Sequence, residues 1–176
     1  MKDFIIIGNS NAVISKDIFP HIRDGKVRLG YNLVKTFGTN KGERKFGNIS
    51  WYSTFPVDKK PLALTASYTP EEYPTYDNYP AIDVGKVKDI PYDYYGTMGV
   101  PVTIFNYDLG DWEIIQVGGD NLPKELFEQY LEQGNKAHYG KPLLLYRKEG
   151  RLVMPFNRIM IRRKTYDHRQ DNRQVL

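Results

Sequence analysis

The first thirty residues alternate between apolar and polar stretches in the order strand, helix, strand. Residues 4–7 form a continuous apolar run, which predicts a fully buried strand that is apolar on both faces. Apolar side chains then recur on one side of a helix predicted over residues 12–23, after turn chemistry at residues 9–11. A second short strand is expected over residues 27–31. This order is typical of a parallel α/β sheet.

A polar stretch and an alternating aromatic stretch follow. Residues 36–45 are polar, contain two glycines and predict a flexible loop. The basic side chains in and beside it either contact phosphates or are simply solvated: Lys35, Lys41, Arg44 and Lys45. Residues 47–55 alternate and are rich in aromatic side chains, which predicts a strand that ends at Pro56.

Beyond Pro56 the chain becomes rich in tyrosine and proline. Half of the fourteen tyrosines fall between residues 68 and 95, interleaved with four prolines. Proline prevents a long helix there, and the aromatic content excludes a disordered linker. We therefore expect an ordered, irregular surface around Lys86 and Lys88, of a kind commonly used for recognition.

The remaining pattern predicts several short strands and one helix. The helix is expected over residues 123–133, with an apolar face formed by Leu126, Phe127, Tyr130 and Leu131. Strands are expected at residues 100–105, 112–117, 141–146, 152–154 and 158–164, with a turn at Glu149 and Gly150. In the last strand the isoleucines alternate with basic residues and Met160, which predicts one core face and one basic face. Residues 165–176 lack an apolar period and predict a mobile tail.

Composition narrows the class of protein. A chain of 176 residues suits one domain or one and a half. The absence of cysteine excludes disulfide frameworks and thiolate metal sites, and it is compatible with the cytoplasmic location that we expect. The three histidines lack metal-ligand spacing, so no metal is expected. No apolar run is long enough for a signal peptide or a membrane span.

The charge is concentrated at one end of the chain. Residues 147–176 contain nine Lys or Arg against three acidic residues, an excess of six positive charges. The whole chain carries +4, so residues 1–146 sum to −2. A basic end on a nearly neutral body is either an edge that contacts phosphates or a solubilising tail.

Four runs of sequence together resemble one family. They are FIIIGNSNAV at residue 4, GNISWYSTFP at residue 47, YDNYPAIDVGKVKDIPYDYYGTMGVPVTIF at residue 76 and RIMIRRK at residue 158. In this order they resemble the EcoRI-type adenine-specific DNA methyltransferases. The resemblance implies the C-terminal part of a Rossmann-like methyltransferase sheet in residues 1–56. An α+β target-recognition region that binds double-stranded DNA would follow in residues 57–164, and the tail would occupy residues 165–176.

The resemblance also implies S-adenosylmethionine as the cofactor, but two motifs of the family are missing. Family members carry a glycine-rich cofactor motif and an Asn-Pro-Pro-Phe motif upstream of the run that matches residues 4–9, and this sequence contains neither. The turn at residues 8–11 lacks the proline pair and is interpreted as a strand-to-helix turn. We therefore expect that the leading strands are missing and that a catalytic half is encoded upstream.

The resemblance suggests roles for two sets of residues. Trp51 or Tyr52, with Asn48 nearby, would hold a flipped adenine by stacking and polar contacts; alternatively, Trp51 is a core residue. Double-stranded DNA would be positioned through its phosphates by five basic residues: Lys86, Lys88, Arg158, Arg162 and Arg163.

Two functional hypotheses remain open from the sequence. In the first, the chain is the C-terminal recognition portion of an adenine-specific DNA methyltransferase. In the second, it is a non-catalytic DNA-binding specificity module or a truncated remnant, with a carbohydrate-binding surface as a more distant version. A carboxylate pair of the glycosidase type is formally present among the acids at residues 77–93, but no self-contained catalytic constellation is visible.

Overall fold

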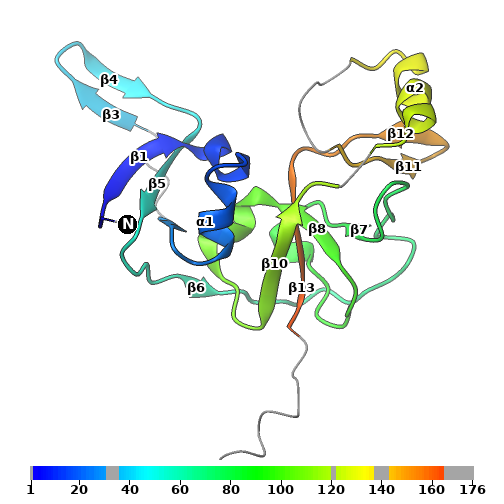
Figure 1. The fold of residues 1–176 in the computed structure, drawn as a ribbon, viewed down its shortest axis with the longest axis horizontal. Helices are drawn as coiled ribbons and strands as arrows, with labels where there is room; N and C mark the ends of the chain where they lie inside the picture. The colour runs from blue at the N-terminus through cyan, green and yellow to red at the C-terminus, as the bar shows by residue number, and fades with distance from the viewer. Residues whose placement is uncertain (1, 31–35, 120–121, 137–142, 165–176) are drawn as a thin grey trace, which may run out of the picture.

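The computed structural model describes residues 2–30, 36–119, 122–136 and 143–164, and within these ranges it is an α/β fold with many strands and few helices (Figure 1). The strands are β1 (Ile5–Asn9), β2 (Arg28–Leu29), β3 (Thr36–Thr39), β4 (Gly42–Lys45), β5 (Ile49–Ser53), β6 (Lys60–Pro61), β7 (Ile82–Asp83), β8 (Met98–Pro101), β9 (Tyr107–Asp108), β10 (Trp112–Val117), β11 (Tyr146–Lys148), β12 (Arg151–Val153) and β13 (Arg158–Arg163). The α-helices are α1 (Phe19–Arg23) and α2 (Lys124–Glu132), and the 3-10 helices are η1 (Ser10–Ile14), η2 (Val87–Asp89) and η3 (Val102–Asn106). Predictions for Tyr31, Lys35, residues 141–142 and the tail at 165–176 lie outside the described residues.

The N-terminal sheet contains three strands in the order β1-β5-β2. Because β1 and β2 are both antiparallel to β5, they run parallel to each other, with β5 between them. Both expected strands are therefore present and parallel, but they are not direct neighbours. The single helix predicted over residues 12–23 is wrong: η1 and α1 are separated by a turn in which the Ser15 hydroxyl accepts a hydrogen bond from the backbone N–H of Ile18.

Strand β1 is exposed, which contradicts the prediction that residues 4–7 are fully buried. The exposed fractions are 59% for Ile5, 52% for Ile6 and 44% for Ile7. The physical reason is that β1 is an edge strand, and in the part of the chain that the structure describes no further strand pairs with its outer side. An apolar run suited to the middle of a sheet thus lies at its border.

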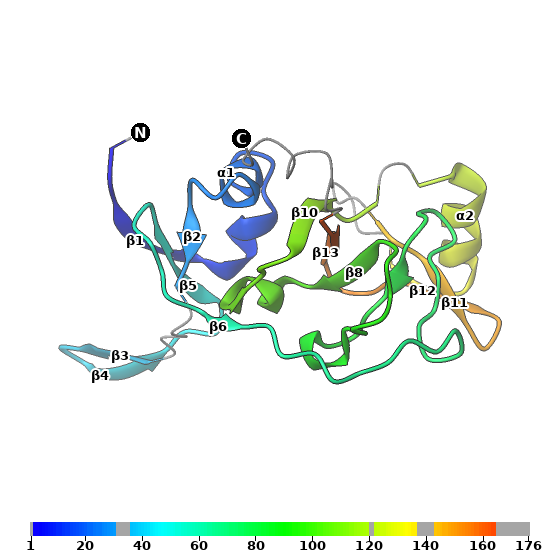
Figure 2. The same cartoon turned by 90° about the horizontal axis from the view of Figure 1, so that it is seen from below.

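Residues 36–45 form a β-hairpin instead of the predicted loop. Strands β3 and β4 pair antiparallel around a two-residue turn, and the hairpin projects away from the rest of the molecule (Figures 1 and 2). Phe37 and Phe46 pack edge to face near its base, with ring centroids 5.4 Å apart. The polar composition concealed the hairpin, because neither of its faces needs apolar residues.

The main sheet has the order β10-β13-β8-β7, with β13 in an interior position. Ile159, Met160 and Ile161 are all completely buried. The two isoleucines belong to the main core, whereas Met160 packs on the other side against Tyr76, Ala81 and Leu144. The prediction of one core face and one basic face is therefore wrong for most of this strand, because Arg158 and Met160 on the second face are buried and only Arg162 is exposed there.

The main core crosses residue 56. It includes Val13, Ile22 and Tyr52 from the N-terminal sheet and its helices, together with Ile104 from η3 and Ile161 from the main sheet. A division of the chain at residue 56 remains a prediction. This continuous core fixes the N-terminal sheet against the main sheet, which lies beside it in both views (Figures 1 and 2).

A third cluster forms where α2 packs near the β11–β12 hairpin. Tyr130 is buried on the helix, and Leu126, Phe127 and Leu131 are partly buried beside Leu145 and Leu152. This confirms the predicted helix and its apolar face. The predicted turn is also confirmed: Glu149 and Gly150 have positive φ angles of 51° and 77°, as tight hairpins require. Throughout the described ranges, no helix has the length and apolar character needed to cross a membrane.

Candidate nucleic-acid interface

Polar groups gather where β1 ends and β5 begins. The backbone N–H of Ser10 donates to the carbonyl of Asn48 at 3.0 Å, and the hydroxyls of Ser10 and Ser50 lie 2.8 Å apart. The Asn9 side chain accepts a hydrogen bond from the backbone N–H of Asn11. This is the carboxyl end of β1, and Asn48, which directly precedes β5, is exposed there.

Trp51 and Tyr52 lie on opposite faces of β5. Tyr52 is 4% exposed and its hydroxyl donates to the backbone carbonyl of Asn9 at 2.7 Å. Burial raises the pKa of the Tyr52 hydroxyl, which keeps it protonated as a donor. Trp51 is only partly buried and lies against Gly30. A stacking platform needs an accessible ring face, so the burial of Tyr52 favours Trp51 for that role.

Gly8 faces the protein and not an open cradle. A Cβ atom placed on Gly8 would lie 2.9 Å from the Tyr52 ring. A glycine that holds a cofactor leaves room for the cofactor to approach the backbone closely. Here that room is filled by Tyr52, so the described residues at this turn do not fit S-adenosylmethionine.

Arg158 is part of a buried ion pair. Its guanidinium donates to both carboxylate oxygens of Asp83, from Nε at 2.8 Å and from Nη2 at 3.3 Å, and to the carbonyl of Phe156 at 2.9 Å. Asp83 and Arg158 are only 6% and 9% exposed. The predicted role of Arg158 in phosphate contact is inconsistent with this position, because its donors are engaged inside the protein.

Tyr76 completes the same cluster. Its hydroxyl donates a hydrogen bond to the Asp83 carboxylate, and burial together with the neighbouring carboxylate raises the pKa of this tyrosine far above its usual range. Gly99 makes the arrangement possible, because a Cβ atom there would lie 2.3 Å from the Tyr76 hydroxyl oxygen. The sequence analysis missed this cluster. The available signal was Asp83 itself, a lone acid between Ile82 and Val84.

The tyrosine-rich stretch is mostly interior. Tyr68 stacks on Tyr73 and lies close to Tyr94, with ring centroids 5.7 Å and 4.6 Å apart. Only Tyr92 and Tyr95 are strongly exposed among the tyrosines of the described chain. The stretch is ordered and irregular, as predicted, but it holds the fold together more than it presents a surface of planar rings.

The other predicted DNA contacts lie on the surface. Lys86 and Lys88 flank the buried Val87 and are exposed, and within the described ranges neither has an ion-pair partner. Arg162 pairs with the Glu113 carboxylate. The Arg163 guanidinium lies over the Trp112 ring at 4.8 Å from its centroid and donates to the carbonyl of Tyr92 at 2.6 Å. These four cations come from η2 and the end of β13.

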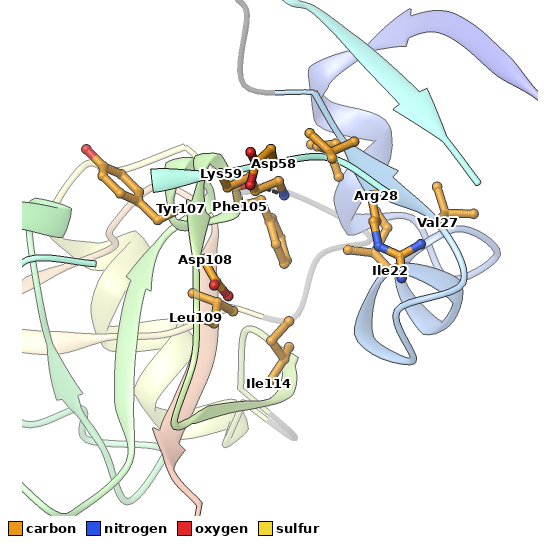
Figure 3. A pocket seen from close by; sticks show the side chains of 12 residues that line it. Ile22, Val27, Arg28, Asp58, Lys59, Phe105, Tyr107, Asp108, Leu109 and Ile114 are labelled. Carbon is orange, nitrogen blue, oxygen red and sulfur yellow. Dashed lines mark hydrogen bonds between the residues drawn. The ribbon is translucent and has the colours of Figure 1, made fainter. Parts of the chain in front are cut away.

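A cavity of about 300 Å³ lies between the N-terminal sheet and the main sheet. Figure 3 shows Arg28 and Ile22 on one side of it, and Lys59, Phe105 and Asp108 on the other. The Lys59 ammonium donates to the carbonyl of Phe105 at 2.6 Å. Burial, followed by the charge of Arg28, lowers the pKa of Lys59. Sequence reasoning did not identify this site.

No metal centre is found in the described part of the chain. No group of three or more His, Cys, Asp or Glu side chains there is arranged to hold an ion.

Comparison with known proteins identifies related sequences. The family described as adenine-specific methyltransferase EcoRI matches residues 35–164. The chain is 38% identical over 167 residues to the Type II methyltransferase M.EcoRI of Escherichia coli, which covers 81% of this chain and 50% of that protein. It is 32% identical to M.MgeORF184P of Mycoplasma genitalium, over 65% of this chain and 44% of the relative. It is 30% identical to M.MpnI of Mycoplasma pneumoniae, over 60% of this chain and 40% of that relative.

The chain therefore spans about half the length of these relatives or less. No solved structure matches it.

Proposed function

Because the chain belongs to the EcoRI family of adenine-specific methyltransferases, we propose that it is the C-terminal recognition portion of a DNA methyltransferase from a restriction-modification system. In this proposal the complete enzyme transfers a methyl group from S-adenosylmethionine to the exocyclic amine of an adenine that has been flipped out of the duplex. The observation that carries the proposal is the incomplete N-terminal sheet, whose exposed edge strand β1 ends at the polar groups beside Asn48.

The target adenine would be held at the carboxyl end of β1. Trp51 supplies an aromatic ring for stacking, and the Asn48 amide supplies a donor and an acceptor for the edge of the base. Tyr52 acts indirectly. Its hydroxyl holds the Asn9 carbonyl, and the next residue, Ser10, donates its backbone N–H to the carbonyl of Asn48. Asn48 directly precedes β5 and Trp51 is the third residue of that strand, so the two groups lie near the same end of β5.

The duplex would be positioned by cations at the surface, of which Arg163 is partly buried. Lys86 and Lys88 have no ion-pair partner among the described residues and are available for phosphates. Arg162 and Arg163 lie at the end of β13, and Arg162 would exchange Glu113 for a phosphate when DNA binds. Arg158 is no longer included, because it neutralises Asp83 in the interior.

The cofactor site would come from the part of the enzyme that this chain does not match. The relatives are about twice as long, and Gly8 faces Tyr52 instead of an open cradle. We propose that a catalytic half carrying the glycine-rich and Asn-Pro-Pro-Phe motifs continues the sheet at the outer side of β1. An exposed row of isoleucines on an unpaired edge supports this arrangement.

Methyl transfer tests the proposal. Labelled S-adenosylmethionine and mixed-sequence duplex DNA are incubated with this chain alone, and with the chain plus the part of M.EcoRI that it does not match. Incorporation into adenine only in the mixture is the expected result. Incorporation by the chain alone would contradict the assignment of the cofactor site to the other half.

A second candidate function is a non-catalytic DNA-binding specificity module. Its support is the pair of exposed lysines, Lys86 and Lys88, which have no ion-pair partner among the described residues and would bind phosphates without any catalytic group. It predicts salt-dependent binding of duplex DNA without methyl incorporation in either reaction, so the same experiment separates the two functions.

A further inference from the structure

The β3–β4 hairpin is exposed on both of its faces. Its residues pair in the register Thr36 with Lys45 and Thr39 with Gly42, and all but Phe37 are exposed. In the described chain no third strand joins it. An isolated two-stranded hairpin is only marginally stable in water, so a hairpin that projects in this way is expected to be completed by a ligand.

The tip of the hairpin is rigidly built. The Thr39 hydroxyl donates to the carbonyl of Gly42 at 2.6 Å and accepts a hydrogen bond from the backbone N–H of Lys41 at 3.2 Å. Gly42 has a φ of 99°, which a residue with a side chain rarely adopts. The turn therefore presents the side chains of Asn40 and Lys41 outward, both of them exposed.

The charge on the hairpin suits a polyanion. Lys41, Arg44 and Lys45 stand against the single acid Glu43. Paired residues share a face, so the register places Lys45 on one face and Arg44 on the other, with Lys41 at the tip. Cations thus line every side of the hairpin, as expected for an element that is surrounded by phosphates.

The position and size of the hairpin suit a DNA groove. It ends at Lys45, three residues before Asn48 in the chain, and it extends from the N-terminal sheet (Figure 1). Four residues of strand extend about 13 Å. The major groove is about 12 Å wide and 8.5 Å deep and admits a two-stranded ribbon.

We propose that the β3–β4 hairpin enters the major groove of double-stranded DNA beside the target adenine. Asn40 and Lys41 read base edges at its tip, because amide and ammonium groups match the donors and acceptors exposed there. Arg44 and Lys45 contact the phosphates that border the groove. This inference rests on the proposed function, which supplies the DNA.

Two paired variants test the hairpin. Binding to random-sequence duplexes is measured against salt for the unmodified chain, for R44A/K45A and for N40A/K41A, each with the catalytic half present. The control is K148A/R151A, which removes two exposed cations from the β11–β12 hairpin. R44A/K45A is expected to reduce the slope of log affinity against log salt by about 2, because two phosphate contacts are lost. The duplexes that each protein binds are also recovered from the random pool and sequenced. For N40A/K41A, the preference for the favoured base is expected to fall about tenfold at one or two positions.

A cleavage experiment locates the hairpin directly. The sequence has no cysteine, so Asn40→Cys provides a single thiol for an iron chelate that cuts nearby DNA. Cuts confined to a few base pairs beside the methylated adenine are expected, and Arg151→Cys should produce none. Unchanged affinity and salt slope in R44A/K45A, or no cuts from residue 40, would overturn the hairpin inference while leaving the proposed function intact. Failure of the unmodified protein to bind DNA would overturn both.

Discussion

The buried pair of Asp83 and Arg158 joins segments that are far apart in the chain. It connects β7 with the start of β13, and Tyr76 donates a third hydrogen bond to the same carboxylate. A buried charge that loses its partner destabilises the folded state far more than an exposed one does, because the protein interior solvates a charge much less well than water. Specificity for one arrangement of the sheet is the benefit that such a pair supplies.

Removing Arg158 should therefore destabilise the protein strongly. We expect Arg158→Ala to lower the free energy of unfolding by about 3–5 kcal/mol, since Asp83 would remain buried and unpaired. Arg162→Ala is the matched control: its pair with Glu113 is exposed and worth about 0–1 kcal/mol. Urea denaturation measures both variants. A loss for Arg158→Ala no larger than that for Arg162→Ala would contradict the structural role.

Variants of Trp51 and Tyr52 should have different effects, one on the capture of the flipped base and the other on the stability of the fold. With the catalytic half and a duplex that carries 2-aminopurine at the target position, Trp51→Ala should weaken capture by about 1–3 kcal/mol, because a stacking face is lost. Tyr52→Phe removes only the bond to the Asn9 carbonyl and should cost about 1 kcal/mol of stability. The fluorescence of the extruded base reports capture. Equal effects of both variants on fluorescence would argue against Trp51 as the platform.

Lys59 should make stability depend on alkaline pH. Its pKa is lowered in the folded protein, so between the folded pKa and the unfolded value of about 10.4 the unfolded chain binds more protons. Stability contributed by Lys59 therefore rises with pH across that window. The difference in unfolding free energy between the unmodified chain and Lys59→Met should increase over the same window. The buried tyrosines, which titrate in both proteins, cancel in this difference. A flat difference would show that the lysine is not desolvated.

At the scale of elements, β1 is the feature with the clearest consequence. A strand with isoleucines at three successive positions is typical of the interior of a sheet, yet each of these side chains is at least 44% exposed. An unpaired apolar edge also invites association with other chains. Both facts are explained if another strand covers β1 in the complete enzyme.

Labelling tests that explanation. The thiol of Ile7→Cys should react readily with a maleimide in the chain alone. It should become protected when the part of M.EcoRI that this chain does not match is added. Phe156→Cys is the control, since Phe156 is 63% exposed and lies away from the N-terminal sheet. Protection at residue 156 as well, or none at residue 7, would argue against this edge as the junction. Protection of residue 7 that depends on the concentration of this chain alone would indicate a second copy instead.

The elements that could be predicted are those whose pattern is local. β10 and α2 show their periodicity within one segment, and the turn at Glu149 and Gly150 shows its conformation in two residues. The interior position of β13 could not be predicted, because it depends on pairing with β8 and β10. The hairpin at residues 36–45 was missed because exposed strands carry no apolar alternation.

In the candidate site, too, only features that depend on a local run of sequence could be predicted. The proposal for Trp51 and Asn48 comes from one local run, in which Asn48 directly precedes β5 and Trp51 lies on it. The interior role of Arg158 depends on Asp83, which lies 75 positions earlier in the chain. The cavity around Lys59 depends on the contact between two sheets. Such relations are set by the tertiary fold, and no spacing in the sequence expresses them.

At the scale of the whole molecule, the interior position of β13 has a consequence for the newly made chain. The ribosome releases residues in order, so β8 and β10 emerge well before the strand that lies between them. Until residues 158–163 appear, the two parts of the main sheet lack their common neighbour: β8 is paired with β7 on one side only, and its other side has no strand to pair with. The sheet therefore assembles late in synthesis. A product that stops before Arg158 is expected to be degraded by proteases instead of competing for DNA.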